Sequence, residues 1–519
     1  MIRPERMERI SIVGPKTRLA TVIDILHKHA VMHIVDHRRD ELDTGAPLEG
    51  SSALSEQLIR ARSLLHSLGA SIEQDEPSPK SEGDITAQLA IISDQVTALD
   101  FERKKANERI TLLNHSKPTP THERDLQALH ATLEANDAAR ERARESHSPF
   151  LLAAEHFLAV EARKAQTPIR FAATKNAFMI SGWAPVKETP ALSAALERAT
   201  DGEIYIEHIP GTDGAPIKLD NNQLVSPYEL LLRMYTIPKY HELDPSFFIF
   251  LSFPLFFGFI LGDIGYGLVL LIGALIVRTT RRKNKPIVAV THIVIASAIA
   301  TIIFGAIYGE FFGASDLGFV KLPYLIHRAH DIMTLLIVAI GVGVVHISIA
   351  LITGFIEEAR HHGGWKAFCA KASWLILLIG AGLIGAAKVF DTQTTLIGGL
   401  LMGLAVILII IGEGARGLVE LPGIFSNIAS YARLMAVGVA SAGLAIVVNE
   451  LAGGLFASGN VISIIIGVIV LIVGHIINIT LGILGSFIHG LRLNYVEFFG
   501  KFYEGGGKAY RPFGSEESK

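Results

Sequence analysis

Cysteine, excess charge and a nucleotide-binding loop are the features that this sequence has least of. The single cysteine, Cys369, excludes an intramolecular disulfide, as expected for a chain that folds in a reducing compartment. Lysine and arginine number 47 against 50 acidic residues, and the formal net charge of −3 argues against a nucleic-acid partner. No Gly-x-x-x-x-Gly-Lys-Ser/Thr loop occurs, because the nearest cluster, Gly505–Lys508, lacks the first glycine and is followed by alanine. We therefore predict a non-catalytic chain with no cofactor and no metal site.

A signal peptide and an even spread of hydrophobicity are also missing. Met1–Ile10 is charged and has no apolar core, so we expect no signal peptide. Mean hydropathy is +0.39, but up to about Asp244 the chain has an ordinary charged composition. Phe247–Phe499 consists mostly of apolar runs that are long enough to cross a hydrocarbon core of about 30 Å. We predict a soluble domain over 1–243 and a transmembrane domain over 244–519.

The soluble domain has the pattern of an α+β fold with a long helical hairpin. A strand, a helix and a second strand are predicted between Ile10 and Val35, which indicates a small α/β lobe, and Ile169–Trp183 and Glu203–His208 are predicted strands of a second lobe. Between the lobes, apolar residues alternate steps of three and four, which is typical of a coiled coil. They are Leu54, Leu58, Ala61, Leu65, Leu68, Ile85, Leu89, Ile92, Val96, Leu99, Ala106, Ile110 and Leu113.

Two prolines in Lys117–His122 break this helix, and a weaker pattern resumes at Leu126, so we predict a long antiparallel coiled-coil hairpin. The heptads allow two functions. One is a generic dimerisation coiled coil, and the other is a rigid lever that resists torque and docks to other subunits.

The transmembrane domain is predicted to be all helical and to cross the membrane eight times. Apolar spans occur at about 247–277, 287–312, 332–357, 372–390, 395–412, 423–452 and 461–490. The first span contains Asp263 in a glycine-rich stretch, and a single helix would bury this carboxylate near the bilayer centre at high cost. Two short helices joined there also place the soluble domain and the basic loop Arg278–Lys285 on one side, the cytoplasmic side, together with the C-terminus. Lys321–His330 is the exception, because it falls outside despite a lysine and an arginine.

Arg433 is the most unusual residue of the penultimate span. With a helix start at Pro422, it lies about ten residues into the helix, near mid-membrane, with no acid within a turn or two of the same helix. Such an arginine must face water, a partner or a cavity, unless it snorkels to a helix end. The next residues are small, and they allow either packing within the chain or close approach of a rotor helix. They are Ala436, Gly438, Ala440, Ser441, Ala442 and Gly443.

The last span carries a stripe of polar residues near one helix face, and a shorter row of charged residues lies before the penultimate span. The stripe is His475, Asn478, Ser486, His489 and Arg492. A lone histidine in such a helix is usually a satisfied hydrogen-bonder, whereas five polar groups on one face favour a hydrated half-channel. Glu413, Arg416 and Glu420 are spaced by three and four, and either a surface ion-pair row or a channel mouth fits them.

Several blocks resemble the a/I membrane subunit of V/A-type rotary ATPases. Asn427–Ala445, with Ser430-Tyr431-Ala432-Arg433-Leu434, is similar to the penultimate helix of that family, and similar blocks occur in family order along nearly the whole chain. They are Val13-Gly14, His33–Asp36, Pro245–Gly267 with its FPLFFGFILGDIGYG, Ile303–Gly313, Gly343–Ile347, His489–Glu497 and Lys501–Phe513. The essential arginine of the family maps onto Arg433 and a second arginine onto Arg492. Eukaryotic members have a histidine at the position of Ser441, so that role is not carried over.

The resemblance implies a stator subunit that provides two ion half-channels beside a rotating proteolipid ring. Its expected partners are that ring, peripheral-stalk subunits of the E/G type, a central-stalk collar subunit of the d/C type and the lipid bilayer of a prokaryotic cell membrane. The transported ion is H⁺ or Na⁺, and ATP chemistry lies in partner subunits. The residues predicted for ion translocation are Arg433, Arg492, His489, His475, Asn478, Ser486, Glu413 and Glu420.

Two rival functions make different demands on the sequence. A secondary transporter predicts internal repeats with paired broken helices, yet the second half shows no break to match the glycines of the first span. A membrane scaffold predicts spans without an ordered polar stripe, which His475–Arg492 contradicts.

Overall fold

The computed structural model describes residues 3–37, 43–69, 82–115, 120–316, 321–390 and 394–515. The chain forms two compact units, one of Arg6–Ala215 with Arg511–Lys519 and one of Met1–Glu5 with Pro216–Tyr510. Residues 216–243, which sequence analysis assigned to the soluble domain, therefore belong to the unit that contains the apolar helices. Two predicted loop segments, Lys117–Thr119 and Asp391–Gln393, lie outside the described residues.

The first unit is built on one antiparallel sheet. Strand β1 (Met7–Pro15) pairs along its length with β5 (Ala177–Pro185), and β6 (Tyr205–Ile209) pairs with the other edge of β1. The far edge of β5 is shared by the short strands β2 (His33–Ile34) and β4 (Ala172–Ala173), and β3 (Asp43–Thr44) pairs with β4. The sequence predicted two separate lobes. That prediction is wrong, because β1 and β5 come from the two predicted lobes and pair with each other.

Helices α1 (Leu19–His29) and α5 (Thr189–Ala199) pack against each other and share a hydrophobic core with the sheet. Val22 and Leu26 of α1 and Leu196 of α5 are fully buried in this core, together with Ile12 and Ile180, which are opposite each other in the β1–β5 register. The predicted strand–helix–strand order is present, but β5 lies between β1 and β2, as in a split β-α-β arrangement.

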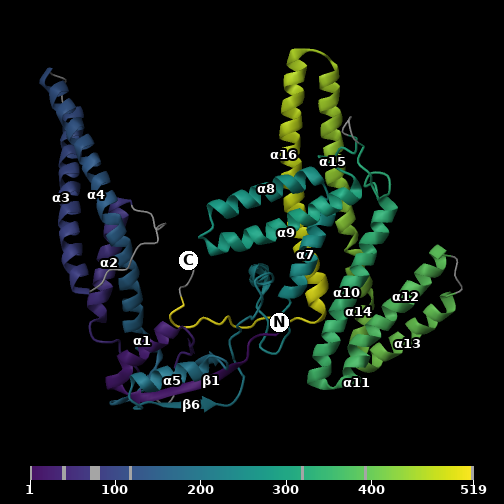
Figure 1. Cartoon of the computed structure of the whole chain (residues 1–519), viewed down its shortest axis with the longest axis horizontal. Helices are drawn as coiled ribbons and strands as arrows, with labels where there is room; N and C mark the ends of the chain where they lie inside the picture. The colour runs from purple at the N-terminus through teal and green to yellow at the C-terminus, as the bar shows by residue number, and fades with distance from the viewer. Residues whose placement is uncertain are drawn as a thin grey trace. The chain divides into compact units, whose positions relative to one another are not determined.

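Three helices, α2 (Ser51–Leu68), α3 (Glu82–Asn114) and α4 (Pro120–Gln166), extend from the sheet (Figure 1). Helices α3 and α4 run antiparallel. Asn136 donates to the Leu99 carbonyl over 2.9 Å, and His147 lies 3.0 Å from Gln95, so later residues of α4 meet earlier residues of α3. The predicted apolar positions Leu65, Leu89, Ile92 and Val96 are buried in one cluster with α4 residues that include Leu151.

The second unit is helical, and its described residues contain six helical stretches that are long and apolar enough to cross a membrane. Two shorter apolar helices, α7 and α8, precede them. The helices of this unit are α6 (Glu229–Tyr235), α7 (Ser246–Leu261), α8 (Ile264–Thr280), α9 (Lys285–Tyr308), α10 (Ile332–His362), α11 (Gly364–Ala367), α12 (Ser373–Phe390), α13 (Thr395–Glu413), α14 (Ala415–Ala429), α15 (Ala432–Ala457) and α16 (Val461–Arg492). The shorter turns of this unit are the 3₁₀ segments η3 (Ser226–Tyr228) and η6 (Phe499–Lys501) and the π segments η4 (Phe368–Ala372) and η5 (Leu493–Phe498). The first unit contains the 3₁₀ segments η1 (Lys16–Arg18) and η2 (Thr167–Arg170).

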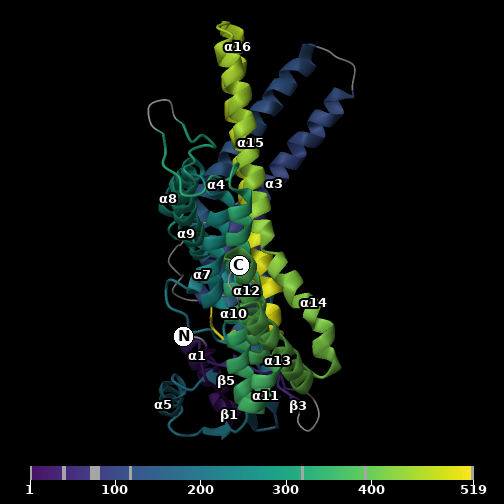
Figure 2. The ribbon, with the colours of Figure 1, turned by 90° about the vertical axis from the view of Figure 1, so that its right-hand side faces the viewer.

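The first predicted span consists of two helices, as the cost of a buried Asp263 suggested. Gly262 has a positive φ of 29° and ends α7, and the Asp263 carboxylate accepts from the Tyr266 amide, so it caps α8. Helices α8 and α9 pack together and run crosswise to the α15–α16 pair in Figure 1, and they are seen nearly end-on in Figure 2.

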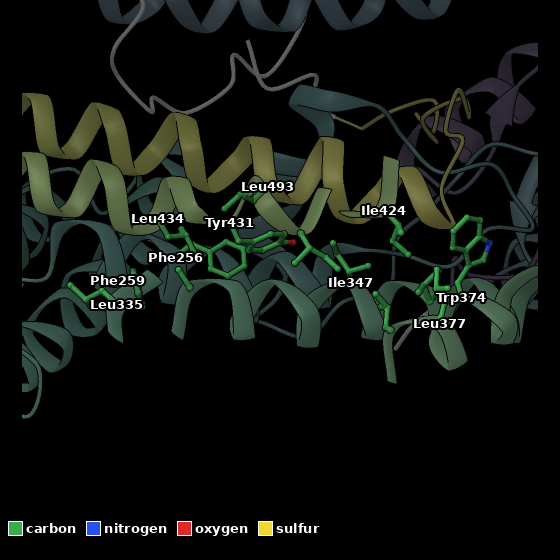
Figure 3. Packing of buried hydrophobic residues seen from close by; sticks show 14 of the residues in the cluster. Phe256, Phe259, Leu335, Ile347, Trp374, Leu377, Ile424, Tyr431, Leu434 and Leu493 are labelled. Atoms are coloured by element: carbon green, nitrogen blue, oxygen red, sulfur yellow. The ribbon is translucent and has the colours of Figure 1, made fainter. Parts of the chain in front are cut away.

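One hydrophobic cluster of this unit joins α7, α10, α12, α13 and the α14–α15 segment. Figure 3 shows Tyr431 and Leu434 close to the helix that carries Leu335 and Ile347. Gly343 of α10 makes room for the Tyr431 ring, since a Cβ at this glycine would lie 2.6 Å from the ring. Tyr431, two residues before Arg433, is therefore held in a closely packed site.

Candidate functional site

The segment that carries Arg433 is bent just before this residue. Helix α14 ends at Ala429 and α15 begins at Ala432, within one apolar stretch of 43 residues, Ala415–Ala457. The Ser430 hydroxyl donates to the Ser426 carbonyl over 3.0 Å, a bond that competes with the helix ladder and bends helices. The predicted helix start at Pro422 is wrong, because Pro422 lies inside α14. The second half of the chain therefore has a broken helix that sequence analysis did not find.

Arg433 is mostly buried and incompletely bonded. Its side chain is 21% exposed, and its Nη1 atom is buried without a hydrogen-bond partner among the residues that the structure describes. The nearest acid is Glu497 of η5, 2% exposed, whose Oε1 lies 3.9 Å from Nη1. This separation is too long for a hydrogen bond and well beyond the 2.7–2.9 Å of charge-assisted pairs. Arg433 thus has an acid of its own chain nearby without being locked to it.

The small residues after Arg433 divide between two faces of α15. Gly438 and Ala442 are buried, and a Cβ on Gly438 would lie 3.0 Å from the Ile260 carbonyl oxygen of α7. Ala436 and Ala440 are exposed and follow Arg433 at helical spacing. The chain therefore uses some small residues for internal packing and leaves others on an open face beside the arginine.

The predicted stripe of α16 divides into two parts, and His475 and Asn478 form the first. The Tyr266 hydroxyl of α8 lies 2.7 Å from His475 Nδ1 and accepts from the Asn478 amide over 2.9 Å. Ser441 donates to Asn478 over 3.1 Å, and His475 Nε2 lies 3.0 Å from the Asn449 side-chain oxygen. Both imidazole nitrogens have partners, so this part is a satisfied network that joins α8, α15 and α16.

Ser486, His489 and Arg492 form the second part. The Ser486 hydroxyl and His489 Nδ1 are buried atoms that lack a hydrogen-bond partner within the described residues. Arg492 is exposed, and its field and that of Arg433 both act on His489. Unlike the first part, this part leaves polar atoms available near Arg433.

Glu413 and Glu420 lie at a cavity of about 740 Å³ that is lined by residues of α10, α13, α14 and the segment from η6 to Glu504. Glu413 Oε1 lies 3.9 Å from the Lys371 ammonium, and its Oε2 is buried with no hydrogen-bond partner in the described part of the chain. Glu420 is paired with the exposed Arg416 over 3.1 Å. The acids lining this cavity are Glu242, Glu357, Glu358, Glu413, Glu420 and Glu504, and the bases are Lys239, Lys371, Arg416 and Lys501.

The arginine of the exceptional loop Lys321–His330 is buried and fully bonded. Arg328 is 3% exposed and donates through Nε to Glu310 over 3.0 Å, with a second contact between Nη2 and Glu310 Oε2. It also donates to the carbonyls of Gly262 over 2.9 Å and Gly438 over 3.3 Å. A cation at the carbonyl end of α7 is favourable, as is Asp263 at the amide end of α8. The rule that basic residues mark cytoplasmic loops does not apply to Arg328, because this side chain is buried and caps the carbonyl end of α7.

Three residues of these sites, Glu497, Tyr266 and Arg328, were not predicted from the sequence. Glu497 and Tyr266 belong to family-like blocks, and Arg328 belongs to the exceptional loop. Their signal was a polar side chain inside an otherwise apolar block, but their partners come from other helices. A search along one helix does not find them.

The sequence is similar to that of known proteins. The model of the V-type ATPase 116kDa subunit family matches residues 85–321 and 421–515, which is more than half of the chain. The chain therefore belongs to the V-type ATPase 116kDa subunit family. The matched regions include α8, Asp263, Glu310, Arg433 and the whole of α16.

Relatives with curated names are ATP synthase subunits. The chain is 32% identical over 406 residues to the A-type ATP synthase subunit I of Methanocaldococcus jannaschii, covering 70% of this chain and 58% of that protein. It is 27% identical to the A-type ATP synthase subunit I of Halobacterium salinarum, with 99% of both chains covered. The V-type ATP synthase subunit I of Borreliella burgdorferi is 30% identical over 54% of this chain and 50% of that protein. The match thus spans about half of some relatives and nearly all of another.

Proposed function

We propose that this chain is the stator membrane subunit of a V/A-type rotary ATPase and carries H⁺ or Na⁺ between two half-channels and a rotating proteolipid ring. One observation supports this function above the others. Arg433 is a permanently charged side chain inside an apolar stretch, it is not locked to an internal acid, and it stands at the head of an exposed row of small residues.

The open face of α15 and α16 is the proposed docking face for the ring. The most apolar part of Val461–Lys501, the stretch that contains α16, has a mean hydropathy of 2.7, yet only 11% of it is buried within this chain. Ala436 and Ala440 leave room for another helix to approach Arg433 closely. A ring carboxylate that reaches Arg433 is held in its ionised form, so its ion leaves. The same positive charge blocks a direct leak between the half-channels.

The two groups of polar residues suit two separate half-channels. The cavity with Glu413 and Glu420 suits the cytoplasmic mouth, and Ser486, His489 and Arg492 suit the path from there toward Arg433. His475 and Asn478, with Tyr266, suit the opposite half-channel.

The remaining architecture follows from the same proposal. The six long apolar helices with α7 and α8 form eight crossings, residues 244–519 form the transmembrane domain, and 1–243 and the C-terminus are cytoplasmic. Helices α3 and α4 form a coiled-coil hairpin that acts as a rigid lever for peripheral-stalk and collar subunits. ATP hydrolysis or synthesis takes place in partner subunits.

The test is ATP-driven ion uptake into vesicles that contain the purified complex. Arg433→Ala is expected to abolish coupled transport while the complex still co-purifies with its nucleotide-binding subunits and small proteolipid. Arg278→Ala, which removes an equal charge from the exposed end of α8, is the matched control and should transport normally. Normal uptake by Arg433→Ala would refute the proposal.

A further inference from the structure

Glu497 is a buried carboxylate that lies beside the Ser430 hydroxyl and Arg433, at the position where the proposed site needs a counter-charge. It lies in the π segment η5, directly after α16, and such segments often occur at functional sites. The residue is 2% exposed, and its Oε2 is buried with no hydrogen-bond partner among the described residues. Its Oε1 faces Arg433 Nη1 at 3.9 Å, and Nη1 also lacks such a partner in the described chain. A half-buried guanidinium and a buried carboxylate are thus close to each other, and each has a buried polar atom without a hydrogen-bond partner in the described chain.

The same unit contains a buried pair that is completely bonded, and the contrast is informative. Arg328 contacts both oxygens of Glu310 and several backbone carbonyls, so this guanidinium has no reason to exchange its partner. Arg433 and Glu497 reach no such arrangement. A buried ion pair is stable only when further hydrogen bonds complete it, so the Arg433–Glu497 pair can be replaced by another acceptor.

We propose that Glu497 is the resting counter-ion of Arg433, which offsets the guanidinium charge between visits of ring carboxylates and gives way when one arrives. This inference rests on the proposed function. A ring carboxylate meets Arg433 only intermittently, and an unpaired guanidinium in an apolar stretch is costly. Glu497 reduces that cost, and it also limits how tightly Arg433 holds an arriving carboxylate. The ring is then able to move on.

The charged and titratable neighbours of Glu497 determine whether loss of its charge strengthens or weakens ion binding by a ring carboxylate. Arg433 and Arg492 act on it with positive charge, and Tyr431 lies close enough to interact with it. The Tyr431 hydroxyl is bonded to His346 Nδ1 over 2.6 Å. Removing the Glu497 charge therefore leaves a more positive environment, in which a ring carboxylate near Arg433 binds H⁺ or Na⁺ less readily.

The test is the dependence of ATP-driven transport on ion concentration, measured with the complete complex in vesicles. For Glu497→Gln we expect half-maximal transport to need about tenfold more of the transported ion on the loading side, which for H⁺ is an acid shift of about one pH unit. Glu497→Asp, which keeps the charge, should shift it less than about threefold. Glu450→Gln, the matched loss of an exposed acid on α15, should behave as wild type.

Three results would overturn the inference. The first is an unchanged half-maximal ion concentration in Glu497→Gln, and the second is an equal shift in Glu450→Gln. The third is failure of Glu497→Gln to assemble while Glu497→Asp behaves as wild type, because this result would mean that the carboxylate has a structural role. Arg433→Ala separates this inference from the proposed function. If Arg433→Ala is inactive and Glu497→Gln is unchanged, only the counter-ion role fails, whereas transport by Arg433→Ala removes the function itself.

Discussion

The buried pair between Arg328 and Glu310 allows a quantitative prediction about what holds the broken helix together. Arg328→Met replaces the guanidinium by an apolar side chain of comparable length and leaves the Glu310 carboxylate buried, with 4% of its surface exposed. Removing one partner of a buried pair costs about 3–5 kcal/mol. The carbonyls of Gly262 and Gly438 also lose a donor, so the upper end of this range is expected.

A double-mutant cycle tests the cause of this loss. Glu310→Leu alone leaves the guanidinium unpaired, whereas Arg328→Met/Glu310→Leu leaves no buried charge, so the double variant should be less destabilised than the sum of the single variants. The expected coupling free energy is about 3 kcal/mol. Arg278→Met, an exposed arginine of α8, is the control and should change stability by less than about 0.5 kcal/mol.

The assay is the apparent Tm of the reconstituted protein at one fixed heating rate, because unfolding of large proteins is often irreversible, and coupling is measured as non-additivity of the Tm shifts. At about 2 °C per kcal/mol for a unit of this size, Arg328→Met should lower Tm by about 6–10 °C. A Tm within about 1 °C of wild type, or strict additivity in the double variant, would show that this pair does not hold α7, α8 and α15 together.

Two further predictions concern packing and pH. Gly343→Ala should destabilise the protein by about 1–3 kcal/mol and lower transport, because the new Cβ would clash with the Tyr431 ring. The control is Gly341→Ala in the same helix, whose Cβ meets no atom within 4 Å and which should be neutral in the same melting assay. In the first unit, burial lowers the pKa of His33, whose Nδ1 lies 3.0 Å from the Arg511 backbone nitrogen. Unfolded His33 binds a proton more readily, so its contribution to stability is present above about pH 6.5 and is lost as the pH falls below that value. The test is hydrogen exchange of residues 511–515, corrected for its intrinsic pH dependence. The exchange rate should rise when the pH is lowered to 5.5 in wild type and should change less in His33→Gln. Equal behaviour of the two proteins would contradict this assignment.

The sequence predicted well those features that depend on local pattern. Apolar runs predicted the ends of most long helices to within a few residues, and the cost of burying Asp263 predicted the break between α7 and α8. The predicted span 423–452 is the exception, because it begins inside α14 and crosses the break before α15. Features that depend on distant segments were not accessible in this way. The pairing of β1 with β5 joins residues about 170 positions apart, and each strand read alone fits a separate lobe equally well.

The second break shows why a rule about residue types is not enough. Pro422 suggested a helix start, yet it lies inside α14, and the bend occurs at Ser430 and Tyr431, where there is neither proline nor glycine. The Ser430 hydroxyl bonds to the Ser426 carbonyl in the preceding turn, which favours a bend, and the Tyr431 ring packs against Gly343 of α10. The second contact joins distant segments, so no pattern within this helix indicates it. The polar stripe of α16 was likewise found by periodicity, but only its partners separate a satisfied network from atoms that are still available.

Arg328, which is buried, and Arg433, which is half-buried, show how charge compensation differs between a structural and a functional arginine. Arg328 is surrounded by acceptors that compensate its charge completely, and such a group stabilises one arrangement of helices. Arg433 has one acid at 3.9 Å and an exposed edge, so its compensation is incomplete within this chain. Incomplete compensation of the arginine charge lowers stability, but it is required if the arginine is to exchange partners. A guanidinium whose hydrogen bonds are all made within its own chain gains little from an arriving carboxylate. A residue that must bind and release a moving partner is therefore expected to be the less satisfied member of such a pair.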